Sequence, residues 1–289
     1  IFKKHQPDYV FHLAAQSLVK KSYINPMYTW QTNTLGTLNV LESLRELKKK
    51  CITVLITSDK SYKNLEIKRG YKENDILGGN DPYSASKASA EMAIQSYIHS
   101  FFPMKKTKVF ISVARAGNVI GGGDWSNDRL IPDCIKSWSK NKRVLIRNPK
   151  STRPWQHVLE ALNGYLFLAY NLKKNKNIHG EVFNFGPNNA SNYSVVYLVK
   201  IMQKYWKKVS WKIDIKSSKK FYESNLLKLN FNKSKKQLKW KSILSFNETI
   251  NMVSSWYQKY YSKKHDMYKV SSNQIQNYEK LINNRLKTK

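Results

Sequence analysis

Short apolar runs and amphipathic stretches alternate along the first two thirds of the chain. The apolar runs at 9–13, 52–56, 109–116 and 182–185 have the length of buried strands. Between them, leucines at every third position predict a helix at 29–47, and further helices are predicted at 83–101 and 159–172. Strands that alternate with helices and lack tight hairpins pair in parallel, so the pattern predicts an α/β fold with helices covering the sheet.

The periodicity weakens after residue 125. Helices are predicted at 128–138, 193–206 and 246–261, and short strands at 143–147 and 211–215. This change predicts a larger first domain, a smaller α/β domain and a polar C-terminal tail, whose last twenty residues form a loosely docked helix or a tail. The bounds that we assign are 1–125 with 151–187 for the first domain, 126–150 with 188–265 for the second, and 266–289 for the tail.

The composition is that of a globular protein with a large positive charge. The 289 residues are 41% hydrophobic and carry a formal net charge of +32. Such a charge favours nucleic acid, but the excess is dispersed lysine without zinc-finger spacing or an aromatic RNA-binding signature. We therefore expect no nucleic-acid partner, and a positive exterior that attracts an anionic substrate.

The apolar runs and the cysteines indicate the cellular setting. No run approaches the roughly 18 residues of a membrane span, so we expect a cytoplasmic protein without a membrane partner. Cys51 and Cys134 lack metal-ligand spacing and are expected to be free, buried thiols, and no metal site is predicted.

Polar side chains follow three of the predicted strands. They are Gln16 after the first, Ser58-Asp59-Lys60 after the second, and Arg115 to Asn118 at the end of the third. Each set by itself is consistent with an ordinary turn. Together they favour a ligand site, because ligands of parallel sheets bind beyond the carboxyl ends of the strands.

Tyr83 and Lys87 are spaced to share one helix face, where the lysine cation can stabilise a tyrosine phenolate. The spacing alone is weak evidence, since Tyr170/Lys174 and Tyr260/Lys264 repeat it in this lysine-rich chain. Only the first pair follows a helix start signal, Asp81-Pro82, and leads into a helix of small residues.

At this point the chain resembles the extended short-chain dehydrogenase/reductase family, and within it the nucleotide-sugar 4,6-dehydratases. The Tyr/Lys pair is general to the superfamily, whereas the Ser-Asp-Lys triplet and the Arg-Pro-Trp-Gln-His segment are narrower. The resemblance implies a doubly wound, Rossmann-type dinucleotide-binding domain and a smaller substrate domain. The matching segments are 12–16, 33–37, 57–60, 78–87, 114–125, 128–133 and 153–158.

The resemblance also implies a reaction, the NAD-dependent dehydration of CDP-glucose to a 4-keto-6-deoxy sugar for surface polysaccharide. Tyr83, assisted by Lys87, would take the proton of the sugar 4-hydroxyl, and Ser58 would hydrogen-bond the same oxygen. Asp59 would protonate the departing 6-hydroxyl. Lys60 stands where related enzymes have a glutamate base, so the identity of the C5 base stays open.

Binding roles are implied in the same way. The cofactor NAD would contact Ala14, Ala15, Asn33, Tyr83, Lys87, Arg115, Asn118 and Val119. The nucleotide sugar would contact Gln16, Asn118, Arg129, Arg147, Arg153 and His157, with arginines suited to bidentate bonds to phosphate.

Several expectations and alternatives remain. The glycine-rich turn for the cofactor pyrophosphate is expected upstream of residue 1, which suggests a fragment of a longer protein. The resemblance implies a homodimer or homotetramer formed through helices 29–47 and 84–101. The alternatives are a dehydratase or epimerase for another nucleotide sugar, such as GDP-mannose or dTDP-glucose, an inactive fragment, and a basic binding protein.

Overall fold

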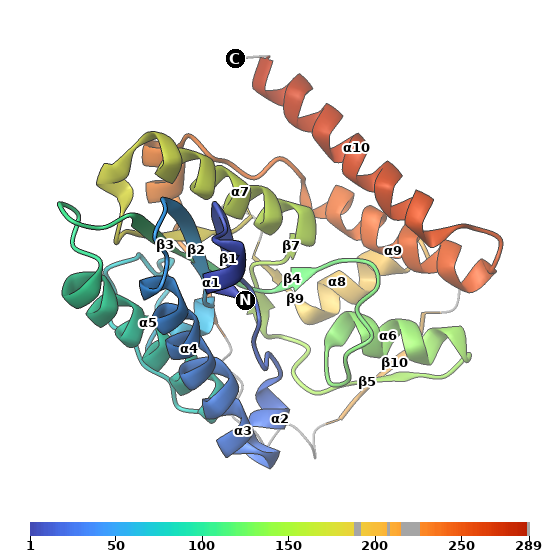
Figure 1. Ribbon diagram of the computed structural model, residues 1–289. Coiled ribbons are helices and arrows are strands. Elements are labelled where there is room, and N and C mark those ends of the chain that lie inside the picture. The colour runs from blue at the N-terminus through green and yellow to red at the C-terminus, as the bar shows by residue number, and fades with distance from the viewer. Residues whose placement is uncertain (188–191, 207–208, 215–225, 288–289) are drawn as a thin grey trace. The chain divides into compact units, whose positions relative to one another are not determined.

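The computed structural model describes residues 1–187, 192–206, 209–214 and 226–287 (Figure 1). By packing, the chain divides into two compact units. Unit 1 comprises residues 1–117, 163–185 and 229–240, and unit 2 comprises residues 118–162, 186–228 and 241–289. The two domains predicted from the sequence also carry binding roles, one for the dinucleotide and one for the substrate. These roles stay predictions.

Unit 1 is built on a parallel sheet with the strand order β1-β2-β3-β8. The two central strands, β2 and β3, are buried along almost their whole length, as expected for a parallel sheet covered on both faces. The predicted α/β fold and the predicted return of 182–185 to the first sheet are confirmed. The strands are β1 (Tyr9–His12), β2 (Cys51–Ile56), β3 (Val109–Ala116) and β8 (Val182–Phe185).

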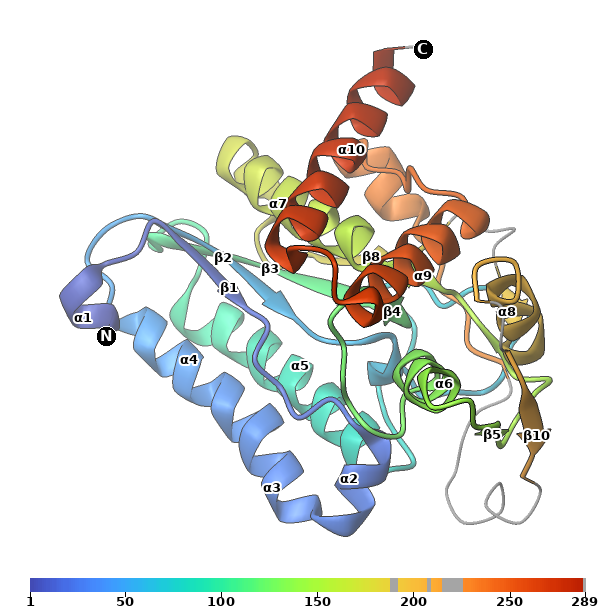
Figure 2. The same cartoon turned by 90° about the vertical axis from the view of Figure 1, so that its right-hand side faces the viewer.

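Helices cover both faces of this sheet. Figure 2 shows α4 (Gly36–Arg45) and α5 (Pro82–Phe101) side by side on one face, and α7 (Val158–Lys174) on the other. The core between the sheet and the helices α4 and α5 is one apolar cluster. It is built from Leu41, Leu44, Leu47, Cys51, Leu55, Ile94, Ile98, Phe102, Val109, Ile111 and Val113. The remaining elements of unit 1 are α1 (Phe2–His5), α2 (Val19–Ile24) and the short turns η2 (Asp59–Ser61), η3 (Lys176–Ile178) and η5 (Ser234–Leu238).

The helix predicted at 29–47 has a different form in the structure. It begins earlier, at Pro26, with Asn25 as its N-cap, and runs as α3 (Pro26–Trp30), a π-helical turn η1 (Gln31–Leu35) and α4. The leucine spacing predicted the helix but not the wider turn. A π-turn of this kind often marks a functional site, and this one contains Asn33.

Unit 2 holds helices packed around a second apolar core, with short paired strands at its edges. The core contains Ile135, Trp138, Leu198, Ile250 and Tyr257. The helices are α6 (Leu130–Ser139), α8 (Val195–Met202), α9 (Phe246–Ser262) and α10 (Met267–Lys287). The paired strands are β4 (Val119–Ile120) with β7 (Gln156–His157), β5 (Val144–Ile146) with β10 (Trp211–Ile213), and β6 (Thr152–Arg153) with β9 (Tyr193–Ser194). Residue 215 of the strand predicted at 211–215 lies outside the described residues.

The segment expected to be a loosely docked helix or a tail forms the long helix α10, which packs on α9. Val270 and Tyr278 are its buried side chains in the described part, and Met267, Leu281 and Ile282 are partly buried against neighbouring apolar clusters.

Two further expectations concern the cysteines and the membrane. Cys51 and Cys134 are free and buried, as predicted, and burial raises the pKa of both thiols. Within the described ranges, no helix is both long and apolar enough to cross a membrane.

Candidate active site

Three strand ends of unit 1 meet at one edge of its sheet, because β1, β2 and β3 are parallel neighbours. Residues 13–16 follow β1, residues 57–60 follow β2, and Gly117 follows β3. This edge is where ligands of parallel sheets bind.

Asp59 lies at the centre of this edge and is only 2% exposed. The Ser58 hydroxyl donates a hydrogen bond to Asp59 Oδ1 at 3.1 Å, and Ser58 Oγ accepts one from the backbone N–H of Lys60 at 3.2 Å. The Lys60 side chain is partly buried. The short turn after β2 therefore joins the Ser58 hydroxyl, the Asp59 carboxyl group and the backbone of Lys60 by hydrogen bonds.

Gly117 makes room for the Asp59 carboxyl group. A Cβ at this position would lie 1.8 Å from Asp59 Oδ2, far inside any real contact distance. The end of β3 therefore accommodates the carboxyl group only because residue 117 has no side chain.

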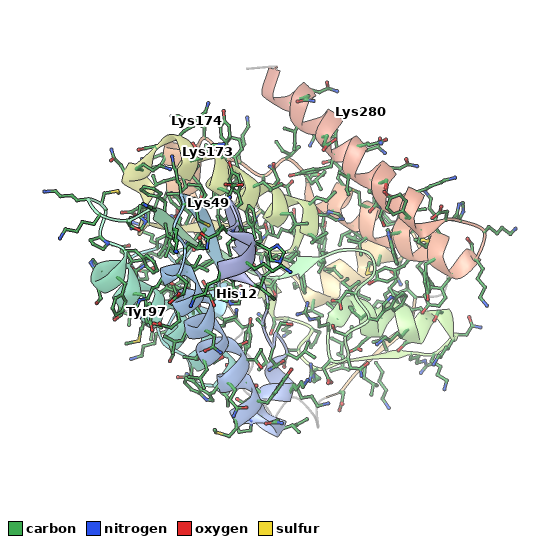
Figure 3. All side chains as sticks on the ribbon, viewed as in Figure 1. His12, Lys49, Tyr97, Lys173, Lys174 and Lys280 are labelled. Carbon is green, nitrogen blue, oxygen red and sulfur yellow. The ribbon has the colours of Figure 1, made fainter. Side chains whose placement is uncertain are left out.

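The Tyr/Lys pair lies on the first two turns of α5. Asp81 caps the helix by accepting the Ser84 N–H at 3.0 Å, and Pro82 occupies the first turn. Tyr83 and Lys87 are buried, with 6% and 5% exposure. The other two Tyr/Lys pairs are on the surface, with Tyr170 50% and Tyr260 42% exposed, as the sequence context predicted; Lys174 of one such pair is labelled in Figure 3.

Lys87 is a buried amine, and little hydrogen bonding compensates for the loss of its hydration. Its Nζ donates to the backbone oxygen of Ile56 at a long 3.4 Å. Burial lowers the pKa of Lys87 to about 8, and the Glu91 carboxylate opposes this effect. At the end of β1, the pKa of His12 is also lowered, first by burial and then by the charge of Lys87 (Figure 3).

Arg115 lies beneath this edge and not at its surface. Its Nε donates to both carboxylate oxygens of Glu91, at 2.8 and 2.9 Å, and its guanidinium lies 4.5 Å from the centre of the Tyr62 ring. Thr57 donates to the same Glu91 carboxylate at 2.6 Å. The Arg115 side chain thus ties β3 to α5 and β2, so any contact of residue 115 with a cofactor falls to its backbone.

Gln16 and Asn33 form a second internal network. The Asn33 amide accepts the Gln16 N–H at 2.8 Å and donates to Gln16 O and to Ser86 Oγ. The Gln16 side chain donates to Leu18 O and Thr29 Oγ1 and accepts the Leu18 N–H. Both amides fix the loop after β1 against α3 and α5. Of the predicted cofactor contacts in this loop, Ala14 is exposed and Ala15 is partly buried.

Among the predicted residues of unit 2, Asn118, Val119 and His157 lie in or directly before the strands of the β4–β7 pair. Val119 pairs with Gln156 and Ile120 with His157, while Asn118 adopts a positive φ of 50° and accepts the Gln156 N–H at 3.3 Å. Arg153, in β6, is 9% exposed, and its guanidinium donates to Thr152 O at 2.8 Å. Arg129 and Arg147 lie apart from this pair. The first is 3.4 Å from the carboxylate of Asp124, and the second follows β5 within electrostatic reach of Asp133.

His157 has an unusual state. It is 1% exposed, and its Nδ1 accepts the Leu159 N–H at 3.3 Å, which places the proton of a neutral ring on Nε2. Burial lowers the pKa of His157 to about 4, so the ring is neutral near pH 7. Nε2 hydrogen-bonds to none of the described residues, which leaves a buried donor.

Three residues near Asp59 and Lys87 were missed in the sequence. Glu91 follows Lys87 by one helical turn, and this spacing on a helix of small residues could have indicated it. Gly117 carries no signal beyond an ordinary turn. Tyr165, on α7, is far from every motif, yet its pKa is raised, first by burial and then by the charges of Asp59 and Tyr83.

A parallel sheet with a Tyr/Lys pair on the helix beside a polar strand end defines the class of short-chain dehydrogenase-like α/β enzymes. Residues 1–253 match the protein-family model described as GDP-mannose 4,6 dehydratase, and the chain belongs to this family of nucleotide-sugar 4,6-dehydratases.

Similar proteins agree with this membership. A CDP-glucose 4,6-dehydratase of Salmonella typhimurium is 41% identical over 277 residues, which cover 94% of this chain and 76% of the relative. A UDP-glucose 4-epimerase of Mycoplasma pneumoniae is 25% identical over 89% of this chain and 78% of the relative. Among solved structures, a UDP-glucuronic acid 4-epimerase from Bacillus cereus, in complex with UDP-glucuronic acid and NAD, has a TM-score of 0.77 at 20% identity, covering 90% of this chain and 78% of that one. This last likeness concerns the fold.

Proposed function

We propose that this chain dehydrates CDP-glucose to CDP-4-keto-6-deoxyglucose, with NAD as a recycled cofactor. The observation that carries the proposal is the buried Ser58–Asp59 pair beside Tyr83 and Lys87, the same set that the family resemblance uses for oxidation and elimination. The similarity to the Salmonella enzyme favours CDP-glucose over other nucleotide sugars.

In this proposal, residues at the carboxyl ends of the strands of unit 1 bind one part of the cofactor NAD. Ala14 and Ala15 offer small side chains directly after β1, and within the described ranges the Lys87 amine makes one long hydrogen bond, to Ile56 O. These residues, the backbone of 115, Asn118 and Val119 would hold NAD, while Asn33 would act through the loop that it fixes. Bound NAD⁺ would supply the hydride acceptor for C4 of the sugar and, once reduced, the hydride donor for C6.

Each catalytic residue then has one proton to hold or move. Tyr83, beside the Lys87 amine, accepts the proton of the sugar 4-hydroxyl, and Ser58 orients that oxygen. The ketone at C4 makes the C5 proton acidic, and Lys60 is our candidate for the base that removes it. Asp59 gives its proton to the departing 6-hydroxyl, so the C6–O bond breaks and water leaves.

The substrate diphosphate is assigned to cations and donors of unit 2. Arg153, Arg129 and Arg147 offer planar guanidinium groups suited to phosphate. His157 offers the Nε2–H donor, and Asn118 its amide. Gln16 stays in the proposal only as a residue that shapes the loop, because its side-chain amide is already hydrogen-bonded. In this proposal the predicted dinucleotide-binding segments 1–125 and 151–187 serve the cofactor, and 126–150 and 188–265 serve the nucleotide sugar.

The direct test is an assay with three substrates. The protein is incubated with NAD⁺ and CDP-glucose, GDP-mannose or dTDP-glucose, and the alkali-induced absorbance of a 4-keto-6-deoxy sugar is measured. Product from CDP-glucose alone is the expected result; product only from another sugar would overturn the substrate assignment. Asp59→Asn should slow elimination far more than C4 oxidation, while Asp8→Asn, a surface carboxylate paired with Lys49, should change neither.

The rival functions make different predictions in the same assay. An epimerase interconverts nucleotide sugars without any 4-keto-6-deoxy product and has no use for Asp59. An inactive chain or a basic binding protein turns over none of the three substrates.

We further propose that two copies associate through the helices at 29–47 and 84–101, which are the end of α3, η1, α4 and α5 in the structure. Both η1 and α4 pack on α5, and exposed apolar side chains in these ranges are Leu35 and Met92, which are 51% and 64% exposed. Such side chains favour a homodimer, or a homotetramer that repeats it. The proposed setting is the cytoplasm, in synthesis of deoxysugars for surface polysaccharide.

A further inference from the structure

Tyr165 is a buried residue close to the predicted catalytic side chains, yet no role in the reaction has been assigned to it. It lies in the part of α7 that belongs to unit 1 and is 6% exposed. A buried tyrosine brings a polar hydroxyl into the interior, where such a group usually has a structural or chemical task.

The packing of α7 on the sheet brings Tyr165 to the active edge. A Cβ on Gly164 would lie 2.5 Å from the Phe185 ring, so the helix can approach the end of β8 this closely only because residue 164 lacks a side chain. The next residue, Tyr165, packs its ring nearly perpendicular to that of Phe185, with ring centres 6.0 Å apart. Tyr165 is therefore fixed beside the last residue of β8.

The register of the sheet connects this position with Asp59. Phe185 is the partner of Ala116 across the β3–β8 pair. The residue after Ala116 is Gly117, which receives the Asp59 carboxyl group against its Cα. Tyr165 and Asp59 thus lie at the ends of two neighbouring strands, β8 and β3.

The electrostatics agree with this geometry. After burial, the charges of Asp59 and then Tyr83 are what raise the pKa of Tyr165. The Tyr165 phenol therefore keeps its proton throughout the physiological range and can act there as a hydrogen-bond donor. A second hydrogen-bond donor to the Asp59 carboxylate, besides Ser58, is the use that this placement suggests.

We propose that Tyr165 is a positioning residue for the elimination step, which orients the Asp59 carboxyl group and stabilises the carboxylate that remains after proton transfer. The inference rests on the proposed function. In that step the Asp59 proton passes to the leaving 6-hydroxyl oxygen, the C6–O bond breaks, and the C5 proton goes to the base. Tyr165 keeps its own proton and, with Ser58, donates to the new carboxylate.

The test is Tyr165→Phe, which removes the hydroxyl and keeps the ring that packs on Phe185. The matched control is Tyr170→Phe on the same helix, where the hydroxyl is on the exposed side chain. In Tyr165→Phe we expect kcat to fall by at least about ten-fold, the scale on which single donors to a developing charge act. The KM for CDP-glucose should stay within about two-fold, because the residue does not bind the substrate. Reduced cofactor should accumulate by absorbance, since C4 oxidation continues while elimination is slowed.

A second measurement does not need turnover. The Asp59 carboxyl carbon is followed by ¹³C NMR as a function of pH in the wild type and both variants. Loss of a donor to the carboxylate should raise the Asp59 pKa by about one unit in Tyr165→Phe, and leave it unchanged in Tyr170→Phe. An unchanged Asp59 titration and an unchanged kcat would overturn the inference. A shifted titration in a protein that dehydrates none of the three sugars would instead overturn the proposed function and retain the Tyr165–Asp59 coupling.

Discussion

Position 117 tolerates no side chain, because a Cβ there would overlap the Asp59 carboxyl group. Gly117→Ala should displace that carboxyl group and lower the rate of elimination by about 100-fold or more, as misplacement of a reacting group by about 1 Å can do. Gly36→Ala is the matched control, since its Cβ would meet only Gln31 O at an ordinary 3.6 Å. Steady-state kinetics measure the rate of both variants, and thermal melting measures their stability. Equal activity of the two variants would contradict this account of Gly117.

Lys87 should destabilise the free protein at neutral pH. Its folded pKa of about 8 lies below the usual 10.5, so the unfolded chain binds more protons between these values and stability rises with pH across that window. Below pH 8 the penalty is fully present, about 3 kcal/mol on the scale of about 1.4 kcal/mol per pKa unit. Lys87→Met should therefore be inactive but more stable than the wild type at pH 7, and this advantage should shrink to below about 1 kcal/mol at pH 10.

Urea unfolding of Lys87→Met and the wild type at the two pH values gives the comparison. Lys236→Met, on the turn η5 and exposed, serves as the control for loss of a surface lysine. If the stability difference between Lys87→Met and the wild type were the same at pH 7 and pH 10, the lowered pKa of Lys87 would be wrong.

At the scale of residues, the sequence revealed those side chains that cluster in short motifs. Ser58, Asp59, Tyr83 and Lys87 were recognisable because each pair is close in sequence and lies at a strand end or a helix start. Arg115 was predicted to line the cofactor, but the burial of its guanidinium depends on Glu91, 24 residues away. Tyr165 reaches the site only through the packing of α7, which no local pattern encodes.

At the scale of elements, α10 is held by a buried carboxylate. Glu160, in α7, accepts the backbone N–H groups of Ile243 and Leu244 at 2.8 and 2.5 Å, and the hydroxyl of Tyr278 at 3.0 Å. All four residues belong to unit 2, and Tyr278 is only 3% exposed. One acid therefore joins the start of α7, the segment before α9 and the helix α10.

Tyr278→Phe should loosen this junction. The substitution keeps the ring but leaves a buried carboxylate oxygen without that donor, and a hydrogen bond to a charged group contributes about 2 kcal/mol. We expect a loss of stability of this size in urea unfolding, with faster amide exchange in α10. Tyr268→Phe is the control on the same helix, because Tyr268 is 80% exposed. Equal stability of the two variants would show that the contact of Tyr278 with Glu160 does not hold α10.

Elements with a strong period were predictable, and those fixed by a few polar contacts were not. The strands at 109–116 and 182–185 agree with the sequence because both are short, mostly apolar segments buried in the sheet. The π-helical turn at Gln31–Leu35 was missed, since the network of Asn33 with Gln16 and Ser86 there joins residues far apart in sequence. The contact that holds α10 was not predictable for the same reason, since Tyr278 and Glu160 are 118 residues apart.

At the scale of the whole molecule, the charge is a property of the surface as a whole. Cationic side chains are spread over the elements of both units, as the labelled Lys49, Lys173, Lys174 and Lys280 illustrate (Figure 3). Few are paired with acids, since the chain has 51 Lys and Arg but 19 Asp and Glu. A dispersed excess of this kind raises the local concentration of any anion around the protein without selecting one partner.

This distribution makes a prediction about salt. A nucleotide sugar carries its negative charge on the diphosphate, so its encounter with a protein of net charge +32 should be faster at low ionic strength. The screening length falls from ~30 Å at 0.01 M to ~8 Å at 0.15 M salt, and kcat/KM should fall several-fold over this range while kcat stays constant. Adding sucrose to the same osmolality controls for effects other than charge. If instead kcat/KM is insensitive to salt and duplex DNA binds with a steep salt dependence, the charge serves nucleic acid, and the alternative of a basic binding protein gains its first direct support.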